Sequence, residues 1–297
     1  MSPARIAVDV EGRQLSLSNL DKVLYPDGFT KGQVLDYYTR ISPVLLPHLA
    51  GRPLTRVRFP NGVEGGSFFE KNAPANAPDW VRTARLPAPG SSRDREIIDY
   101  VVCDELATLV WTANLAGLEL HTPMWRAAGP AKKSVPLPPD LAVVDLDPGP
   151  PATIVECCLV AQLVRAETDL AWLPKTSGSK GMQLYAPLRD GATSEQVRED
   201  IKALAVRLER AHPHLVVSRM TKSLRPGKVL LDWSQNTAAK TTVSVYSLRA
   251  RPTPTVSTPI TWDEVEACST PEDLMFRAGD VLERVERGGD LFEPLLA

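Results

Sequence analysis

Short strand-like runs with very short connections constrain the fold of this chain more than any other sequence feature. RIAVDV precedes QLSLS around Glu11-Gly12, and AWLPKTS precedes MQLYAPL around the segment SGSKG. Parallel neighbours need a connection of a dozen or more residues, so both pairs are predicted to run antiparallel. With the helices interleaved between such runs, the pattern predicts an α/β fold of the α+β type, in which mixed, largely antiparallel sheets are flanked by helices.

Capping signals mark where the helices begin. Three pairs have the capping-box pattern, a threonine with Glu or Gln three residues later: Thr30 with Gln33, Thr153 with Glu156, and Thr193 with Gln196. The helices that they start are expected to end near residues 48, 167 and 211. Asp104 is expected to cap a helix that runs through Ala116 and is closed by Gly117, and residues 270–273 to start a final helix. LAVVDLD, VLLDWS and TTVSVYSL are predicted strands.

The charge balance limits the kind of partner that the chain can bind. With 34 Lys and Arg against 36 Asp and Glu, the net charge is −2, which argues against binding nucleic acid through bulk charge alone. From Trp262 onward, however, ten acids face three bases, so the rest of the chain is mildly basic. That body permits a polyanionic ligand without requiring one.

The remaining composition indicates an ordinary soluble protein. The hydrophobic share is 43% and the charged share 24%. No apolar run approaches the roughly 18 residues that span a bilayer, and the first residues contain no apolar signal-peptide core. The four cysteines lack metal-type spacing, which favours a reducing cytoplasm over a disulfide framework or zinc site: Cys103, Cys157, Cys158 and Cys268.

The segment Asp145-Leu146-Asp147-Pro148-Gly149 carries the sharpest chemical signal. Residues i and i+2 of a strand project from one face, so the two carboxylates converge where Pro-Gly ends the strand. Asp232 follows a second apolar run. Three such carboxylates could hold two hard divalent ions, Mg²⁺ or Mn²⁺, for in-line phosphoryl transfer. For the Asp-Leu-Asp pair alone, a turn cap with an ordinary ion pair is an equally good interpretation.

The segment Lys175-Thr176-Ser177-Gly178-Ser179-Lys180-Gly181 indicates anion binding more weakly. Its glycines let backbone N–H groups turn toward an anion, while hydroxyls and lysine add donors and charge. The spacing is not that of a P-loop, and a strand follows instead of a helix. Taken alone, the segment is better explained as a plain Gly-Ser hairpin.

Several bases and an aromatic pair are candidates for nucleic-acid contacts, because aromatic rings can stack on bases while cations hold phosphates. The bases are Lys22, Lys31, Arg52, Arg56, Arg58, Lys71, Lys222, Arg225 and Lys228, and the rings are Phe68 and Phe69. Each charge alone is better explained as part of a solvated face, and one of the two rings is expected in the core, since adjacent strand residues point opposite ways. His121 suits either a core position or ligand binding.

Taken together, several segments resemble the polymerase domain of bacterial end-joining ligases (ligase D) and its stand-alone relatives, in the archaeo-eukaryotic primase superfamily. The segments, between about residues 19 and 256, are NLDKVLYP, GGSFFEKN, LELHTPMW, VVDLDPG, KTSGSKG, MTKSLRPGKVLLDWSQN and KTTVSVYSLRARPTPTV. The resemblance implies one primase-polymerase domain over residues 1–297. Its expected parts are an α/β half with DNA-binding elements (1–135), a catalytic half like an RNA-recognition motif (136–260) and an acidic helical segment (261–297). No ligase or phosphoesterase module is visible, so a free-standing member or an excised domain is expected.

The resemblance also implies the roles of individual residues. Asp145, Asp147 and Asp232 would be the catalytic metal ligands for Mn²⁺ or Mg²⁺ in a two-metal site. The nucleotide would be bound by Ser177, Lys180 and Arg249 at the triphosphate, His121 near the sugar and Phe69 at a base. DNA would be bound by Lys22 and Lys31 at a downstream 5′-phosphate, by Phe68 and Lys71, and by Arg225 where DNA ends meet.

One position departs from the family pattern SGSKGLH. This chain reads SGSKGMQ, so Gln183 stands where a histidine is expected to contact the phosphates of the nucleotide. Glutamine donates a hydrogen bond but carries no charge, so a working polymerase with weakened nucleotide binding is predicted.

The function implied is nucleotide addition to a primer at short gaps or broken ends with a 5′-phosphate, with NTPs preferred over dNTPs. Ku, a separate ATP-dependent DNA ligase and a location at the cytoplasmic nucleoid are further expectations, without a membrane. Two alternatives stay open. One is a non-catalytic or weakly active module that binds or bridges DNA ends. The other is a phosphatase of the haloacid-dehalogenase type, which needs a parallel sheet.

Overall fold

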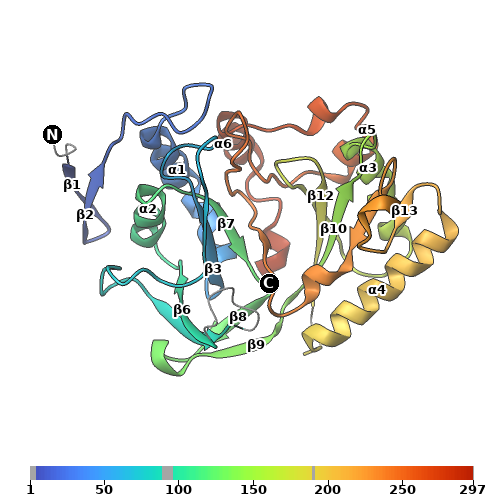
Figure 1. The fold of residues 1–297 in the computed structure, drawn as a ribbon, viewed down its shortest axis with the longest axis horizontal. Coiled ribbons are helices and arrows are strands. Elements are labelled where there is room, and N and C mark those ends of the chain that lie inside the picture. The colour runs from blue at the N-terminus through green and yellow to red at the C-terminus, as the bar shows by residue number, and fades with distance from the viewer. Residues whose placement is uncertain (1–4, 89–95, 189–190, 297) are drawn as a thin grey trace.

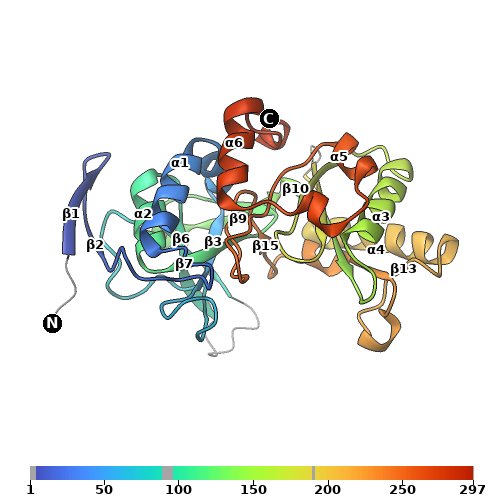
Figure 2. The ribbon, with the colours of Figure 1, turned by 90° about the horizontal axis from the view of Figure 1, so that it is seen from above.

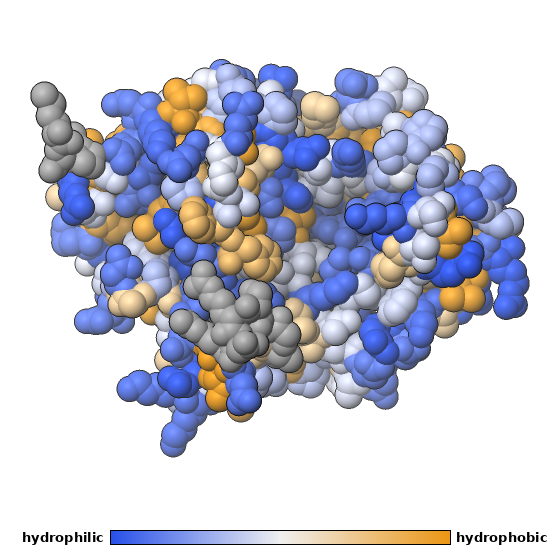
Figure 3. Space-filling model, viewed as in Figure 1, coloured by the Kyte–Doolittle hydropathy of each residue, from blue (hydrophilic) through white to orange (hydrophobic). Residues whose placement is uncertain are grey.

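Two sheets, one in each half of the molecule, form the framework (Figure 1). The structure is a computed structural model that describes residues 5–88, 96–188 and 191–296. In this part of the chain no helix has the length and apolar character needed to cross a membrane. Hydrophilic residues cover most of the face seen in Figure 3, which is hollowed near its middle.

The first half is built on a six-stranded antiparallel sheet in the order β15-β7-β3-β6-β5, with β4 added to β3. A hairpin of β1 and β2 precedes it, and β8 and β9 form a separate two-stranded ribbon. The bounds are β1 Arg5–Val10, β2 Arg13–Ser18, α1 Lys31–Leu49, β3 Pro53–Arg58, β4 Phe68–Glu70, β5 Thr83–Pro87, β6 Ile97–Val102, α2 Leu106–Asn114, β7 Gly117–Thr122, β8 Trp125–Ala128, β9 Val135–Pro139 and β15 Thr242–Val243.

The second half is built on a five-stranded sheet in the order β11-β12-β10-β14-β13. Its pairs are antiparallel except β13 with β14. The bounds are β10 Leu141–Pro148, α3 Ile154–Ala166, β11 Leu173–Thr176, β12 Met182–Pro187, α4 Ser194–Ala211, β13 Val216–Val217, β14 Val229–Asp232, α5 Trp262–Ala267 and α6 Ala278–Gly288. Short 3₁₀ turns are η1 Ala131–Lys133, η2 Lys222–Leu224, η3 Trp233–Asn236, η4 Pro271–Leu274 and η5 Glu293–Leu296.

Strand β10 lies between two hydrophobic cores, and its alternation decides which face carries the chemistry. Val144 and Leu146 pack with α3 and α4, whereas Val143 belongs to the core of the first half. Since side chains alternate along a strand, Asp145 and Asp147 share the face of Val143, away from the two helices. The carboxylates are thereby directed toward the first half of the molecule.

The last helix ties the end of the chain to the first half. Seen from above, α6 lies beside α1 (Figure 2), where Arg40 pairs with Glu286 at 3.2 Å. His48 Nε2 lies 2.7 Å from Asp290 Oδ2 next to this contact. The C-terminal segment is therefore part of the packed structure.

The structure confirms most of the predicted elements. The three capping boxes and the two antiparallel strand pairs form as expected. The antiparallel pairing of β10 on both sides contradicts the parallel sheet that the phosphatase alternative requires.

Three local predictions were wrong. Glu105, not Asp104, is the N-cap of α2, because Asp104 instead accepts a hydrogen bond from Gly51 N at 2.8 Å and pairs with Arg82. That helix ends at Asn114, and Gly117 begins β7. Residues 270–273 start only the short 3₁₀ turn η4, and the last helix, α6, begins later, at Ala278. The strand predicted over TTVSVYSL is limited to the two residues of β15.

Candidate active site

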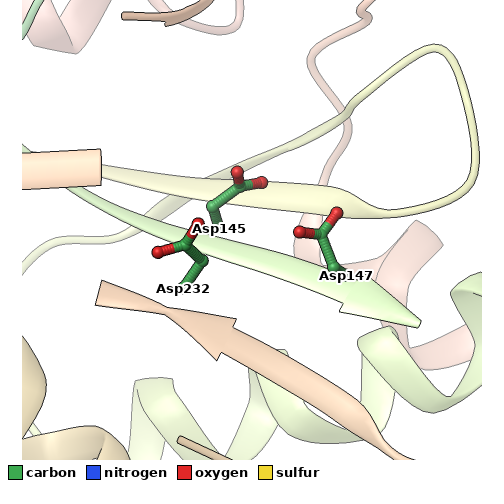
Figure 4. A group of neighbouring side chains, drawn as sticks. All are labelled: Asp145, Asp147 and Asp232. Atoms are coloured by element: carbon green, nitrogen blue, oxygen red, sulfur yellow. The ribbon is translucent and has the colours of Figure 1, made fainter. Parts of the chain in front are cut away.

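Three carboxylates converge at the centre of the second sheet (Figure 4). Asp145 and Asp147 lie on β10, and the register of β10 with β14 places Asp232 directly opposite Asp145. One oxygen from each residue lies within 4.8 Å of the others. Burial raises the pKa of Asp145 to about 7, and the charge of Asp147 adds to the effect. Burial, followed by the charge of Asp232, also raises the pKa of Asp147, so the cluster disfavours its own full ionisation.

This arrangement fits a divalent cation. The cluster offers only carboxylate oxygens, the donors that Mg²⁺ and Mn²⁺ prefer, and a bound cation would remove the repulsion among them. Asp232 is also held in place, since it accepts hydrogen bonds from Ser234 N and Gln235 Nε2, both at 2.9 Å. The candidate metal ligands are therefore oriented by their surroundings.

A row of polar side chains crosses the sheet at the level of this cluster. Strand register aligns Lys175 on β11 with Gln183 on β12, Gln183 with Asp145, and Asp145 with Asp232. Gln183 Nε2 donates to Asp145 Oδ1 at 3.0 Å, and Lys175 Nζ donates to Gln183 Oε1 at 2.6 Å. Gln183 is buried, and its amide bonds these two side chains. Lys175 belongs to the glycine-rich segment described in the sequence, but nothing in the sequence indicated that its side chain is buried.

The loop between β11 and β12 is a tight turn. Ser179 N and Gly181 N both donate to Ser177 Oγ at 3.2 Å, so these two N–H groups point into the turn, as in the plain Gly-Ser hairpin that was the favoured interpretation of the segment alone. Arg249 Nη1 donates to Ser177 O at 2.8 Å, which fixes the loop against the segment after β15. Lys180 is exposed. The groups that this loop offers to an anion are thus mainly side chains.

Glu119 links two of the predicted nucleotide-binding residues. Its Oε1 accepts from Arg249 Nε at 3.1 Å and from Ala250 N at 3.0 Å, and its Oε2 lies 3.0 Å from His121 Nε2. Burial alone would raise the pKa of Glu119, but the hydrogen bonds and the charge of Arg249 lower it to about 2. Glu119 and His121 are i and i+2 on a strand, a same-face signal that LELHT already contained.

Both phenylalanines of β4 are exposed, which contradicts the expectation of one core ring. Phe68 is 53% and Phe69 60% exposed. The ring centroid of Phe69 lies 6.5 Å from that of His121. Lys71 Nζ reaches Ala239 O at 3.3 Å, so this strand lies near the segment that follows the carboxylate of Asp232.

The remaining predicted DNA contacts lie in two places. Lys31 N donates to Lys22 O at 2.8 Å, and the buried Lys31 ammonium bonds Ser18 O. Burial, and then the charge of Lys22, lower the pKa of Lys31 to about 8. Arg225 lies against the turn after β10 instead, where its carbonyl approaches Gly149 so closely that a Cβ there would be 2.1 Å away.

Comparison with known proteins identifies the family. A model of the LigD primase-polymerase domain matches residues 30–292. The chain belongs to this family. The resemblance seen in the sequence and the mixed, largely antiparallel fold are thereby confirmed, and the LigD primase-polymerase domain is a nucleotidyltransferase.

Individual relatives agree with this assignment. The "Multifunctional non-homologous end joining protein LigD" of Mycolicibacterium smegmatis is 44% identical over 95% of this chain and 36% of its own length. The "Bifunctional non-homologous end joining protein LigD" of Bacillus subtilis is 31% identical over 93% of this chain and 43% of its own. The chain thus spans less than half the length of either relative. A solved structure, the "Polymerase Domain from Mycobacterium tuberculosis Ligase D in complex with DNA", superposes with a TM-score of 0.88 at 42% identity, covering 95% of this chain and 98% of that one.

Proposed function

We propose that the chain is a metal-dependent primase-polymerase that adds nucleotides to a primer at short gaps or broken DNA ends carrying a 5′-phosphate. Its role would be in non-homologous end joining or gap filling. The observation that carries the proposal is the triad of Asp145, Asp147 and Asp232 on neighbouring antiparallel strands, in a chain of the LigD primase-polymerase family.

The carboxylates would hold two divalent cations, Mn²⁺ or Mg²⁺. When bound, such cations activate the attacking hydroxyl and neutralise the leaving pyrophosphate. The protein's own contribution is orientation: the shared strand fixes Asp145 and Asp147 on one face, and Gln235 with the Ser234 backbone fixes Asp232. Asp232 is buried and Asp145 half-buried, which strengthens their attraction for a cation, while Asp147 is exposed.

The nucleotide would lie between the loop after β11 and strand β7. Lys180 and Arg249, with Ser177, would bind the triphosphate. Gln183 would lie near the phosphates, since it stands where the family pattern has a histidine that contacts them. His121 would contact the sugar, and the exposed Phe69 would stack on a base. Glu119 bonds both His121 and Arg249, so it would keep the sugar and phosphate contacts at a fixed separation.

DNA would be held at two sites. Lys22 and Lys31, adjacent through their backbones, would bind the downstream 5′-phosphate, with charge-assisted bonds supplying the affinity. Phe68 and Lys71 would contact the strand near the active site, and Arg225 would act where two ends meet. The expected cellular setting is the nucleoid in the cytoplasm, with Ku and an ATP-dependent ligase as partners. We expect the enzyme to prefer NTPs over dNTPs. Its single domain, residues 1–297, would comprise a DNA-binding α/β half (1–135), a catalytic half (136–260) and an acidic helical segment (261–297).

Primer extension on a short gap tests the proposal. Asp145→Ala and Asp147→Ala should each lower extension by at least about 10²-fold, because a lost ligand removes several kcal/mol of transition-state stabilisation. The exposed Asp169→Ala is the matched control and should extend normally. Substrates with and without the 5′-phosphate, NTPs against dNTPs, and Mn²⁺ against Mg²⁺ resolve the finer preferences.

Two outcomes would contradict the proposal. Extension that persists in both aspartate variants would show that the carboxylates are not the metal site. DNA binding by the unaltered protein with no extension under either metal would instead favour the end-bridging module.

A further inference from the structure

Lys175 is a fully buried lysine with no assigned purpose. It is 0% exposed, and its Nζ contacts Gln183 Oε1 at 2.6 Å, Ser257 Oγ at 2.6 Å and Val243 O at 3.1 Å. Burying an ammonium is costly unless its charge is compensated. The sequence therefore retains an expensive group next to the carboxylate cluster, and the structure should show what balances it.

The three partners of Lys175 match the three donors of a charged ammonium. Ser257 Oγ donates its hydrogen to Thr176 O at 2.9 Å, so it accepts from Lys175. Val243 O and Gln183 Oε1 can only accept. Three acceptors need three N–H groups, which only the charged ammonium provides. Burial lowers the pKa of Lys175 well below its usual range, and the charge of Asp145 acts in the opposite direction.

Gln183 lies between Lys175 and Asp145 and bonds both. Its oxygen faces the Lys175 amino group and its NH₂ faces Asp145 Oδ1, the orientation that suits a charged ammonium and an ionised carboxylate. Gln183 is thus a neutral bridge between a buried cation and Asp145 Oδ1. The hydrogen bonds described for Asp145 involve Oδ1, which leaves Oδ2 available to the carboxylate cluster.

We propose that Lys175 and Gln183 are positioning residues for Asp145, fixing one carboxylate oxygen by a Lys–Gln–Asp hydrogen-bond chain and presenting the other to the metal. This inference rests on the proposed function, since it assumes that Asp145 is a metal ligand. It assigns Gln183 a role in metal binding in addition to the phosphate contact expected from the family pattern, and it gives Lys175 its purpose.

The chain also explains how glutamine can replace histidine at this position. A neutral imidazole has one acceptor and one donor nitrogen, so it can connect the same ammonium and carboxylate. An aliphatic side chain can connect neither, and it would leave the buried ammonium and carboxylate each without this partner. Glutamine and histidine should therefore be interchangeable for metal binding. They differ toward a nucleotide, because only histidine can carry a positive charge.

Binding of Mn²⁺ alone, followed through the electron paramagnetic resonance signal of the free aqueous ion, tests the inference without nucleotide or DNA. Loss of residues that orient metal ligands typically costs 10–100-fold in affinity, so Gln183→Met should raise the Kd for Mn²⁺ by about that factor. Gln183→His should bind Mn²⁺ with nearly the affinity of the unaltered protein, and much more tightly than Gln183→Met. Gln162→Met is the matched control, because Gln162 bonds Cys158 O on the opposite, helical side of the sheet.

The outcomes separate the two proposals. If the unaltered protein binds Mn²⁺ no better than Asp145→Ala, the metal site itself fails. If the unaltered protein binds well and folded Gln183→Met binds equally well, the positioning role is refuted. Should Gln183→Met not fold, Gln183→Asn takes its place, since its amide is one methylene too short to reach both partners and must show the same loss.

Discussion

Replacing Glu119 with glutamine tests whether the network around His121 and Arg249 stabilises the fold through the charge of this carboxylate. Glu119 is mostly buried and keeps its charge because Arg249, Ala250 N and His121 all bond it. Its pKa of about 2 compares with an ordinary value of 4.5. At 1.36 kcal/mol per pKa unit, the ionised form contributes about 3 kcal/mol to the free energy of unfolding at neutral pH.

The sign of the pH dependence follows from the direction of the shift. A depressed folded-state pKa means that the contribution is complete above the unfolded value of 4.5 and is lost as the pH falls toward 2. Between pH 6 and 3.5 the unaltered protein should lose about 1.4 kcal/mol through this group alone. Urea unfolding at both pH values, for the unaltered protein and Glu119→Gln, measures the difference, in which the other titrating groups largely cancel.

The stability gap between the two proteins should therefore be about 3 kcal/mol at pH 6 and narrow by about half at pH 3.5. Glu64→Gln, an exposed change of the same type, should show no gap. A gap that is equally wide at both pH values would refute the reasoning, because it would reflect lost packing instead of charge. Extension assays should show a raised KM for the nucleotide, since Arg249 and His121 lose the negative charge of their common partner.

Two further predictions concern phosphate binding and the loop after β11. Because the pKa of Lys31 is about 8, its ammonium is lost between pH 7 and 9, and the part of the DNA affinity that depends on a 5′-phosphate should fall about tenfold over this range. Fluorescence anisotropy with phosphorylated and unphosphorylated DNA ends measures this part of the affinity. An equal fall in the Lys31→Gln variant would contradict the prediction. Gly181→Ala should lower the free energy of unfolding by at least about 1–3 kcal/mol, because its Cβ would lie 2.1 Å from Leu146 O. In urea unfolding, Gly66→Ala, with no atom within 4 Å of the added carbon, is the control, and equal stability of the two variants would count against a steric role for Gly181.

Local rules predicted the elements whose signals are local. The capping boxes at Thr30, Thr153 and Thr193 combine two hydrogen bonds within four residues, so neighbouring segments hardly affect them. The cap of α2 failed because Asp104 bonds Gly51 and Arg82, which are distant in the sequence. Tertiary contacts of this kind override a local capping preference, and no residue spacing reveals them.

The residues of the candidate site also fall into those that local sequence patterns predict and those that depend on tertiary packing. Alternation along one strand was enough to place Asp145 and Asp147 together, and an apolar run before Asp232 indicated a similar strand. The burial of Lys175 and the exposure of both Phe68 and Phe69 depend on which elements cover each strand face, and that follows from the packing of two halves. Only Glu119 was within reach of the same alternation rule, through its i and i+2 relation to His121.

Strand register and site chemistry depend on the same residues. A slip of β12 by one position would put Met182 or Leu184 opposite Asp145, and Lys175 would lose its amide partner as well. A buried ammonium and a buried carboxylate would then both be left without this bridge, at a cost of several kcal/mol. The flanking residues Met182 and Leu184 would also move out of the core shared with α3 and α4. The polar row thus selects the register in which Gln183 lies between Lys175 and Asp145, so the arrangement proposed to position Asp145 is also the one that the folded sheet prefers.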